Sequence, residues 1–237
     1  MTATALEGGT PRPGRGKLLE RKLRLAEPWL AEVTEKFWEH PRLREMLPFF
    51  YMRVYSAACT SIEVMRAAEL RCRELASSDA AAAMLGEYLE RHIADEEEHP
   101  DWLLADLEVL GYGRAEVERQ AASASVASLI GPQYYWVHRV HPVALLGYFA
   151  VLEGFPPTLE HLEQVERHTG FPRSAFRMLR AHATLDLEHA DEIFALLDQL
   201  PLTAEQESWI AISAFETMEK VTGVFRELLH LYGDGRN

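Results

Sequence analysis

The sequence predicts an all-α fold, a single-domain bundle of about seven helices. Apolar residues recur at helical spacing along the chain, and no stretch shows the sustained β-branched alternation of a strand. Capping residues and Pro or Gly stops divide the chain into segments with short connections, which favours antiparallel neighbours. Hydrophobic residues make up 48% of the 237 residues, which is enough to build a full core.

The expected helices run from residue 17 to about residue 232. Ser77–Asp79 offer N-cap chemistry, Pro142 suits a first helical turn, and Thr203 with Gln206 forms a capping box. The Gly- and Pro-rich residues 1–16 are expected to be a disordered tail, which leaves 17–237 as one metal-binding domain. The predicted helices are 17–39, 47–76, 80–110, two within 115–139, one from Pro142 to about 153, 158–169, 173–199 and 203–232.

The composition limits the classes of partner. The formal net charge of -13 argues against a nucleic-acid or anionic-membrane surface. No apolar run approaches the roughly 20 residues that span a bilayer. The two cysteines, Cys59 and Cys72, lie in an apolar stretch, and nothing indicates secretion. We therefore expect a soluble cytoplasmic protein.

Two eight-residue segments place histidines and carboxylates on one helix face. In HATLDLEH, His182, Asp186 and His189 stand at i, i+4 and i+7, and HIADEEEH repeats the spacing with His92, Glu96 and His99. A solvated face is the alternative. Chance predicts roughly 0.07 such matches in a chain of this composition, so two copies favour a shared role.

Two further carboxylates stand in apolar surroundings. Glu153 ends the apolar helix that follows Pro142, where the helix dipole disfavours a carboxylate, so it is either exposed or held by a cation. Glu63 falls among small and apolar residues on the 47–76 helix if the helical phase is as assumed. The resulting nitrogen and oxygen donors, without thiolate, suit iron or manganese rather than structural zinc. These donors are numerous enough for two metal ions, and their distribution over several helices resembles the arrangement of ligands in four-helix di-iron proteins.

The chain resembles the haem-oxygenase-like di-iron oxidases, often described as iron-containing redox enzymes, which share the fold of TenA and the pyrroloquinoline-quinone synthase. The resemblance covers roughly residues 45–230 and is carried by HIADEEEHPDWLLADLEVLG, PVALLGYFAVLEGFPP and HATLDLEHADEIFALLD. It extends less securely to Glu63, and position 92 departs from relatives that have a ligand Glu there, which leaves His92 as a ligand or a supporting residue. The family's metal ligands correspond to Glu96, His99, Glu153, His182, Asp186 and His189.

The resemblance implies an O2-dependent oxidase or oxygenase with two iron ions and neither haem nor flavin, although a manganese–iron pair remains open. Its implied partners are O2, a reductant or redox protein, and a small substrate resembling an amino acid, an amine or a fatty acid, within specialised biosynthesis. A homodimer is a further possibility. Glu96 and Glu153 are the candidate bridging ligands.

Other readings of the sequence remain open. Cys59 could serve a TenA-like thiamin hydrolase, a cofactor-independent enzyme could share the fold, and a non-catalytic metal-binding protein could share the cluster. His40, at a helix end before Pro41, is a poor haem ligand. A pocket could be lined by Tyr134, His138, His141 and Tyr148, although such runs more often form amphipathic core.

Overall fold

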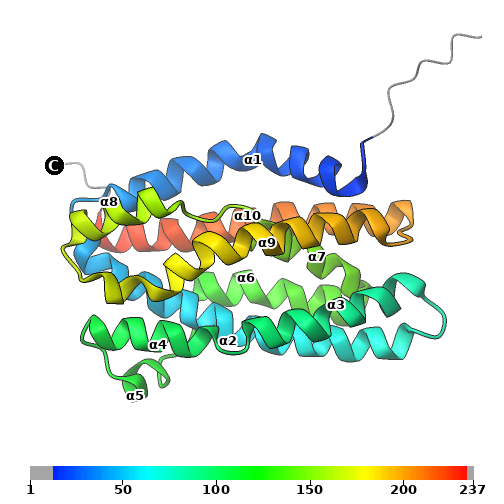
Figure 1. The fold of residues 1–237 in the computed structure, drawn as a ribbon, viewed down its shortest axis with the longest axis horizontal. Coiled ribbons are helices and arrows are strands. Elements are labelled where there is room, and N and C mark those ends of the chain that lie inside the picture. Colours follow the sequence, from blue (N-terminus) through cyan, green and yellow to red (C-terminus); the bar gives the residue numbers. More distant parts are fainter. Residues whose placement is uncertain (1–12, 234–237) are drawn as a thin grey trace, which may run out of the picture.

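The computed structural model describes residues 13–233, and the regular elements within that range are all helical (Figure 1). The predicted all-α class is therefore confirmed. Five of the helices exceed sixteen residues and run roughly along the long axis of the molecule. The α-helices are α1 (Arg15–Trp38), α2 (Leu43–Leu75), α3 (Ala80–Glu96), α4 (His99–Val109), α5 (Arg114–Val117), α6 (Ala124–Tyr135), α7 (Leu145–Leu152), α8 (Leu159–Thr169), α9 (Arg177–Gln199) and α10 (Ala204–Tyr232).

The first and last helices lie side by side and point the same way. Arg15 at the start of α1 pairs with Glu207, and Nε2 of His40, just beyond α1, donates a 2.9 Å hydrogen bond to the carbonyl of Gly233. In Figure 1, α1 covers the top of the bundle, α9 crosses the middle, and α2 with α3 and α4 forms the lower side. The core between them is apolar, with Phe50 and Phe225 stacked at 5.4 Å near its centre.

The predicted helix 80–110 is broken in the structure. It ends as α3 at Glu96 and resumes as α4 at His99, with Glu97 and Glu98 in a turn. Pro100 explains the break, because proline has no N–H to donate to the carbonyl of Glu96 and its ring crowds that carbonyl. The expectation that the HIADEEEH pattern lies inside one continuous helix is therefore wrong. Its third member, His99, instead opens a new helix.

Other boundaries follow their local signals. Thr203 and Gln206 form the expected capping box at the start of α10, and Gly170 ends α8 with a left-handed φ of 66°. Between α6 and α7 the chain forms a π-helix, Trp136–Val140, and a 3-10 turn, Pro142–Ala144. The predicted tail lies mostly outside the described residues, but α1 begins at Arg15, inside it. Among the described helices, none is both long enough and apolar enough to cross a membrane.

Candidate metal centre

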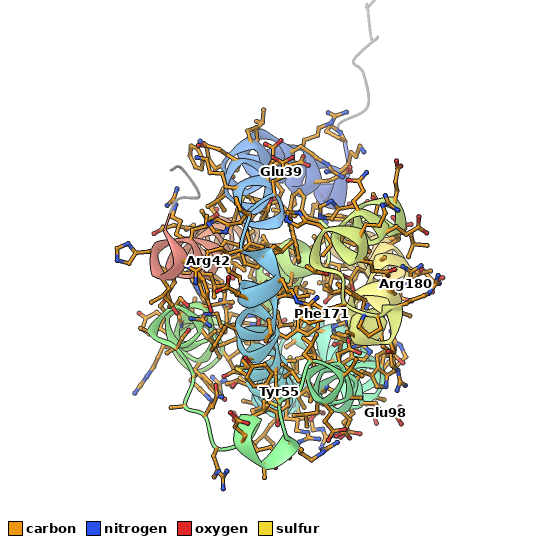
Figure 2. All side chains as sticks on the ribbon, turned by 90° about the vertical axis from the view of Figure 1, so that its left-hand side faces the viewer. Glu39, Arg42, Tyr55, Glu98, Phe171 and Arg180 are labelled. Carbon is orange, nitrogen blue, oxygen red and sulfur yellow. The ribbon has the colours of Figure 1, made fainter. Side chains whose placement is uncertain are left out.

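Three stretches of helix bring the predicted ligands together in the middle of the bundle. The α3–α4 junction supplies His92, Glu96 and His99, and α9 supplies His182, Asp186 and His189. Glu153 is the residue that caps the C-terminus of α7. On α3 and α9 the side chains point inward because the opposite faces of these two helices are largely polar and exposed. Glu98, labelled at the periphery of the end-on view in Figure 2, is an example from the junction itself.

One group of donor atoms forms where α3 and α4 meet α9. The Nδ1 atom of His99 lies 2.7 Å from Oε2 of Glu96 and 3.2 Å from Nε2 of His182. His182 is itself fixed by a 2.5 Å contact between its Nδ1 and Oδ1 of Asp186. Glu96, His99 and His182 thus offer ligand atoms that all lie within 4.8 Å of one another, the spacing that a single metal ion requires.

A second group forms on the other side of Glu96. Nδ1 of His189 lies 3.7 Å from Oε1 of Glu96 and 3.5 Å from Oε2 of Glu153. His92, Glu96 and His189 offer ligand atoms that all lie within 4.8 Å of one another, and Nε2 of His92 contacts the other oxygen of Glu153 at 3.2 Å. Glu96 therefore presents one oxygen to each group, which is the arrangement of a carboxylate that bridges two ions.

Two atoms of the second group lack hydrogen-bond partners among the described residues. Oε2 of Glu153 and Nδ1 of His189 are both buried and unpaired. An unpaired buried polar atom costs about 1–3 kcal/mol, so such atoms are rare without a compensating ligand. Burial raises the pKa of Glu153 above its ordinary value, and the hydrogen bond from His92 only partly opposes this. A cation between the two atoms would satisfy both, so the donors fit a metal ion.

The two ligand-bearing helices are locked together by Asp106. This residue lies on α4, two turns after His99, and is fully buried. Its carboxylate accepts the backbone N–H groups of Arg177 at 3.1 Å and Met178 at 2.9 Å, the first residues of α9. Sequence reasoning missed Asp106, although it is one of only two acids in the otherwise apolar run WLLADLEVL. The contact fixes how α9 is placed against α4, and hence the distance between His182 and His99.

A cavity of about 1070 Å³ opens onto the metal centre. It reaches from the ligands to α1 and to residues 154–157, which connect α7 with α8. Tyr148 lines it, as predicted, and its hydroxyl contacts that of Ser61 at 2.5 Å. The ligands that line the cavity are His92, Glu96, Glu153, His182 and Asp186, and its apolar walls include Phe50, Val54, Met65, Leu129, Phe149 and Phe225.

Several predicted positions lie elsewhere. The expectation that Glu63 faces the core is wrong: the side chain is exposed, and its nearest polar contact is the hydroxyl of Tyr134 at 3.4 Å. The helical phase assumed for α2 was incorrect, and Ser61 rather than Glu63 faces the cavity. Tyr134 and His138 do not line the cavity: Tyr134 is partly exposed near the end of α6, and His138 is exposed on the π-helical turn. His141 is buried but is occupied by a contact with Asp79.

Residues of the alternative readings also lie outside the centre. Cys59 is half-buried and does not line the cavity, and burial raises the pKa of its thiol, the opposite of an activated nucleophile. His40 joins the turn after α1 to the end of α10, with Nδ1 accepting the Arg42 N–H and Nε2 donating to the carbonyl of Gly233. Neither residue supplies a donor to the metal centre.

Comparison with known proteins agrees with this geometry. Residues 60–219 match the model of a family described as iron-containing redox enzymes, and this range contains every proposed ligand. The chain belongs to this family. No curated protein matches the chain significantly.

Solved structures share the fold of this family member. A domain of unknown function with a haem-oxygenase-like fold from Shewanella denitrificans gives a TM-score of 0.69, covering 94% of this chain and 95% of that chain at 14% identity. A TenA homolog from Pseudomonas syringae pv. tomato gives a TM-score of 0.67, covering 96% and 98% at 13% identity. At these identities the likeness shows the fold alone, and it confirms the haem-oxygenase-like bundle.

Proposed function

We propose that the protein is a non-haem di-iron oxidase or oxygenase that uses O2 on a small organic substrate. The observation that carries the proposal is the division of donors into two groups that share Glu96. One group combines Glu96 with His99 and His182, and the other combines it with His92 and His189, both of which contact Glu153. Asp186, held against His182, completes a set of carboxylates and imidazoles that suits iron.

The residues around the centre have separable roles. Glu96 would bridge the ions, whereas His99 and His182 would hold one and His189 and Glu153 the other. His92 stacks on the ring of Tyr88 and meets Phe149 edge-on, and its Nε2 lies 3.2 Å from Glu153, so it would orient the Glu153 carboxylate and supply its hydrogen bond. When bound, iron would supply reversible electron transfer and coordination positions for O2.

The cavity supports a substrate of mainly apolar character. Its walls near the ligands are aromatic and aliphatic, and the pair formed by Ser61 and Tyr148 offers a polar contact within them. Such walls bury the substrate and keep bulk water from the reacting atoms. An amine, amino acid or fatty acid with an apolar chain fits these surroundings.

The experiment that tests the proposal measures iron and O2 together. Protein is loaded with Fe(II) under anaerobic conditions, the bound iron per chain is determined, and O2 uptake and visible absorption are followed after mixing with O2. We expect about two iron ions per chain and a transient visible absorption, both lost in His189→Ala. His141→Ala is the matched control, because it removes a buried histidine outside the centre.

Each contrary result has a clear meaning. A stoichiometry of one ion that persists in His189→Ala would overturn the two-group assignment. Iron binding with no O2 uptake, with or without candidate substrates, would overturn the oxidase proposal and leave a metal-binding protein.

A further inference from the structure

A second hollow lies on the outside of the bundle, away from the metal centre. It has a volume of about 910 Å³ and lies between α1 and α6, with α10 as its floor. Trp29 on α1 is 72% exposed and Tyr135 on α6 is 62% exposed at its rim. Ile212 and Phe215 of α10 are exposed between them. Contiguous apolar surface of this kind marks a site of interaction, whereas scattered exposed residues do not.

The apolar surface continues along α1. Leu18 and Leu25 are exposed and share one side of the helix with Trp29, because positions i, i+7 and i+11 repeat at helical spacing. The core-facing side of α1 is a separate stripe that includes Leu19, Leu23 and Leu30. Because α1 packs against the core through the first stripe, the second apolar stripe has no packing role within the monomer. In Figure 1, α1 is the outermost helix along the top of the part of the chain that the structure describes.

We propose that this surface, the α1–α6–α10 face, joins two copies of the chain in a two-fold homodimer. Its area is of the right size for that purpose. A whole aromatic side chain presents about 150–250 Å², so the exposed fractions together amount to on the order of 800 Å². A stable interface of ordinary size buries about 800 Å² per partner. The side chains included in this estimate are Leu18, Leu25, Trp29, Tyr135, Ile212 and Phe215.

The side of α10 that faces this surface carries both an acidic and a basic residue, which suits a second copy of the chain better than a partner with a uniformly positive or uniformly negative surface. Glu219 and Arg226 are both exposed and stand two turns apart on one side of α10, about 10 Å along its axis at ~1.5 Å per residue. A two-fold axis between them runs the two α10 helices antiparallel and brings each Arg226 to the Glu219 of the other copy. Within one chain, Glu219 lies 3.5 Å from the ammonium group of Lys220. The positive charge of Arg226 contributes, after that of Lys36, to lowering the pKa of Glu32 on α1.

The point through which that axis passes is free of side chains. Gly223 lies between Glu219 and Arg226, and a Cβ atom built on it would meet nothing within 4 Å. The contacts of α1 with α10, Arg15 to Glu207 and His40 to Gly233, join residues 192 and 193 apart. The same register places Trp29 level with Val221, beside the axis. The helices can therefore approach closely there, with a tryptophan from each copy next to the crossing.

The experiment measures the oligomeric state of the full chain by sedimentation velocity over a range of concentrations. We expect a species of twice the 26.9 kDa chain mass. Trp29→Glu and Ile212→Glu should raise the dimer dissociation constant by roughly ten- to a hundredfold, as for central interface residues. Leu70→Glu is the matched control, because Leu70 is 58% exposed on α2, outside the α1–α6–α10 face. It should leave the constant unchanged.

Four further variants test the two-fold arrangement itself. Arg226→Glu and Glu219→Arg should each weaken the dimer about tenfold, and the double variant should recover it, since it restores opposite charges across the axis. Gly223→Gln should weaken the dimer while preserving or raising the stability of the fold, because glycine is a poor helix former.

Three results would overturn the proposal. A chain that stays monomeric at all concentrations has no such dimer. A dimer weakened as much by Leu70→Glu as by Trp29→Glu does not use this face. A double charge variant that stays as weak as the single ones does not have the axis between Glu219 and Arg226.

Discussion

Two pairings of a buried histidine with a carboxylate, in different parts of the bundle, differ in whether their polar atoms all have hydrogen-bond partners. In the pair formed by His141 and Asp79, Nε2 of the histidine lies 3.1 Å from Oδ2 of the carboxylate. Nδ1 of His141 accepts the N–H of Val143, and Oδ1 of Asp79 accepts the N–H of Ala82. At the metal centre, by contrast, Nδ1 of His189 and Oε2 of Glu153 face each other at 3.5 Å without a hydrogen bond.

The difference shows that proximity alone does not identify a metal site. A completed pair caps a helix and joins two segments, and its interactions contribute to the folding free energy. An uncompleted cluster of buried donors opposes folding until a ligand satisfies it. Removing His189 should therefore affect mainly iron binding, whereas removing His141 should affect mainly the stability of the fold.

The largest effect is expected for His189→Ala. Loss of Nδ1 leaves Glu153 and Glu96 without their shared nitrogen donor, so the affinity for iron should fall more than about a hundredfold at one of the two groups. Equilibrium dialysis with metal analysis measures this change. His141→Ala should keep the wild-type iron content, and an equal loss in both variants would remove the distinction between the two pairings.

A smaller effect is expected for His92→Phe. The ring keeps its place between Tyr88 and Phe149, but Glu153 loses the hydrogen bond from Nε2. Removal of a residue that supports a metal ligand typically lowers metal affinity about 10–100-fold. Iron titration followed by dialysis checks the value. His92→Gln, which retains a donor, should lose less, and a complete loss of one ion in both variants would instead identify His92 as a ligand.

His141→Ala should act on stability. It removes the partner of Asp79 and the acceptor for the Val143 N–H, and we expect the free energy of unfolding to fall by about 1–2 kcal/mol. Urea unfolding of the metal-free protein measures the change. The same experiment on His189→Ala should show a smaller loss, because its Nδ1 has no hydrogen bond to lose; the reverse order would contradict the comparison.

The smallest effect is expected for Asp79→Asn, and it should depend on pH. Burial alone would raise the pKa of Asp79, but the Ala82 N–H and His141 outweigh it and hold the pKa below its ordinary value. A lowered pKa in the folded state adds stability above the unfolded pKa of about 3.9 and loses it as pH falls further. Wild type should exceed the variant by up to about 1 kcal/mol at pH 7 and approach it below pH 4 in urea unfolding. A difference that grows toward low pH would refute the assignment.

The candidate ligand set could be proposed from the sequence because its signal is local. His182, Asp186 and His189 repeat at helical spacing, and Glu153 is an isolated acid at the end of an apolar helix. The structure brings these residues together with Glu96 and His99. Glu63 was misplaced because a stripe of small residues on α2 does not fix the helical phase, and the phase of a long buried helix depends on what packs against it.

The sequence by itself determined the all-α class, the two histidine–carboxylate repeats and most helix ends, since these depend on residues within one or two turns. Only the tertiary structure decided which polar side chains are left without partners. In the folded chain His141 contacts Asp79, and Glu63 is exposed to solvent. Asp106 accepts backbone hydrogen bonds from the start of α9, whereas Glu153 and His189 face each other without a hydrogen bond. Hydrogen-bond satisfaction is a property of groups far apart in the chain, so the spacing of residues along a helix does not determine it.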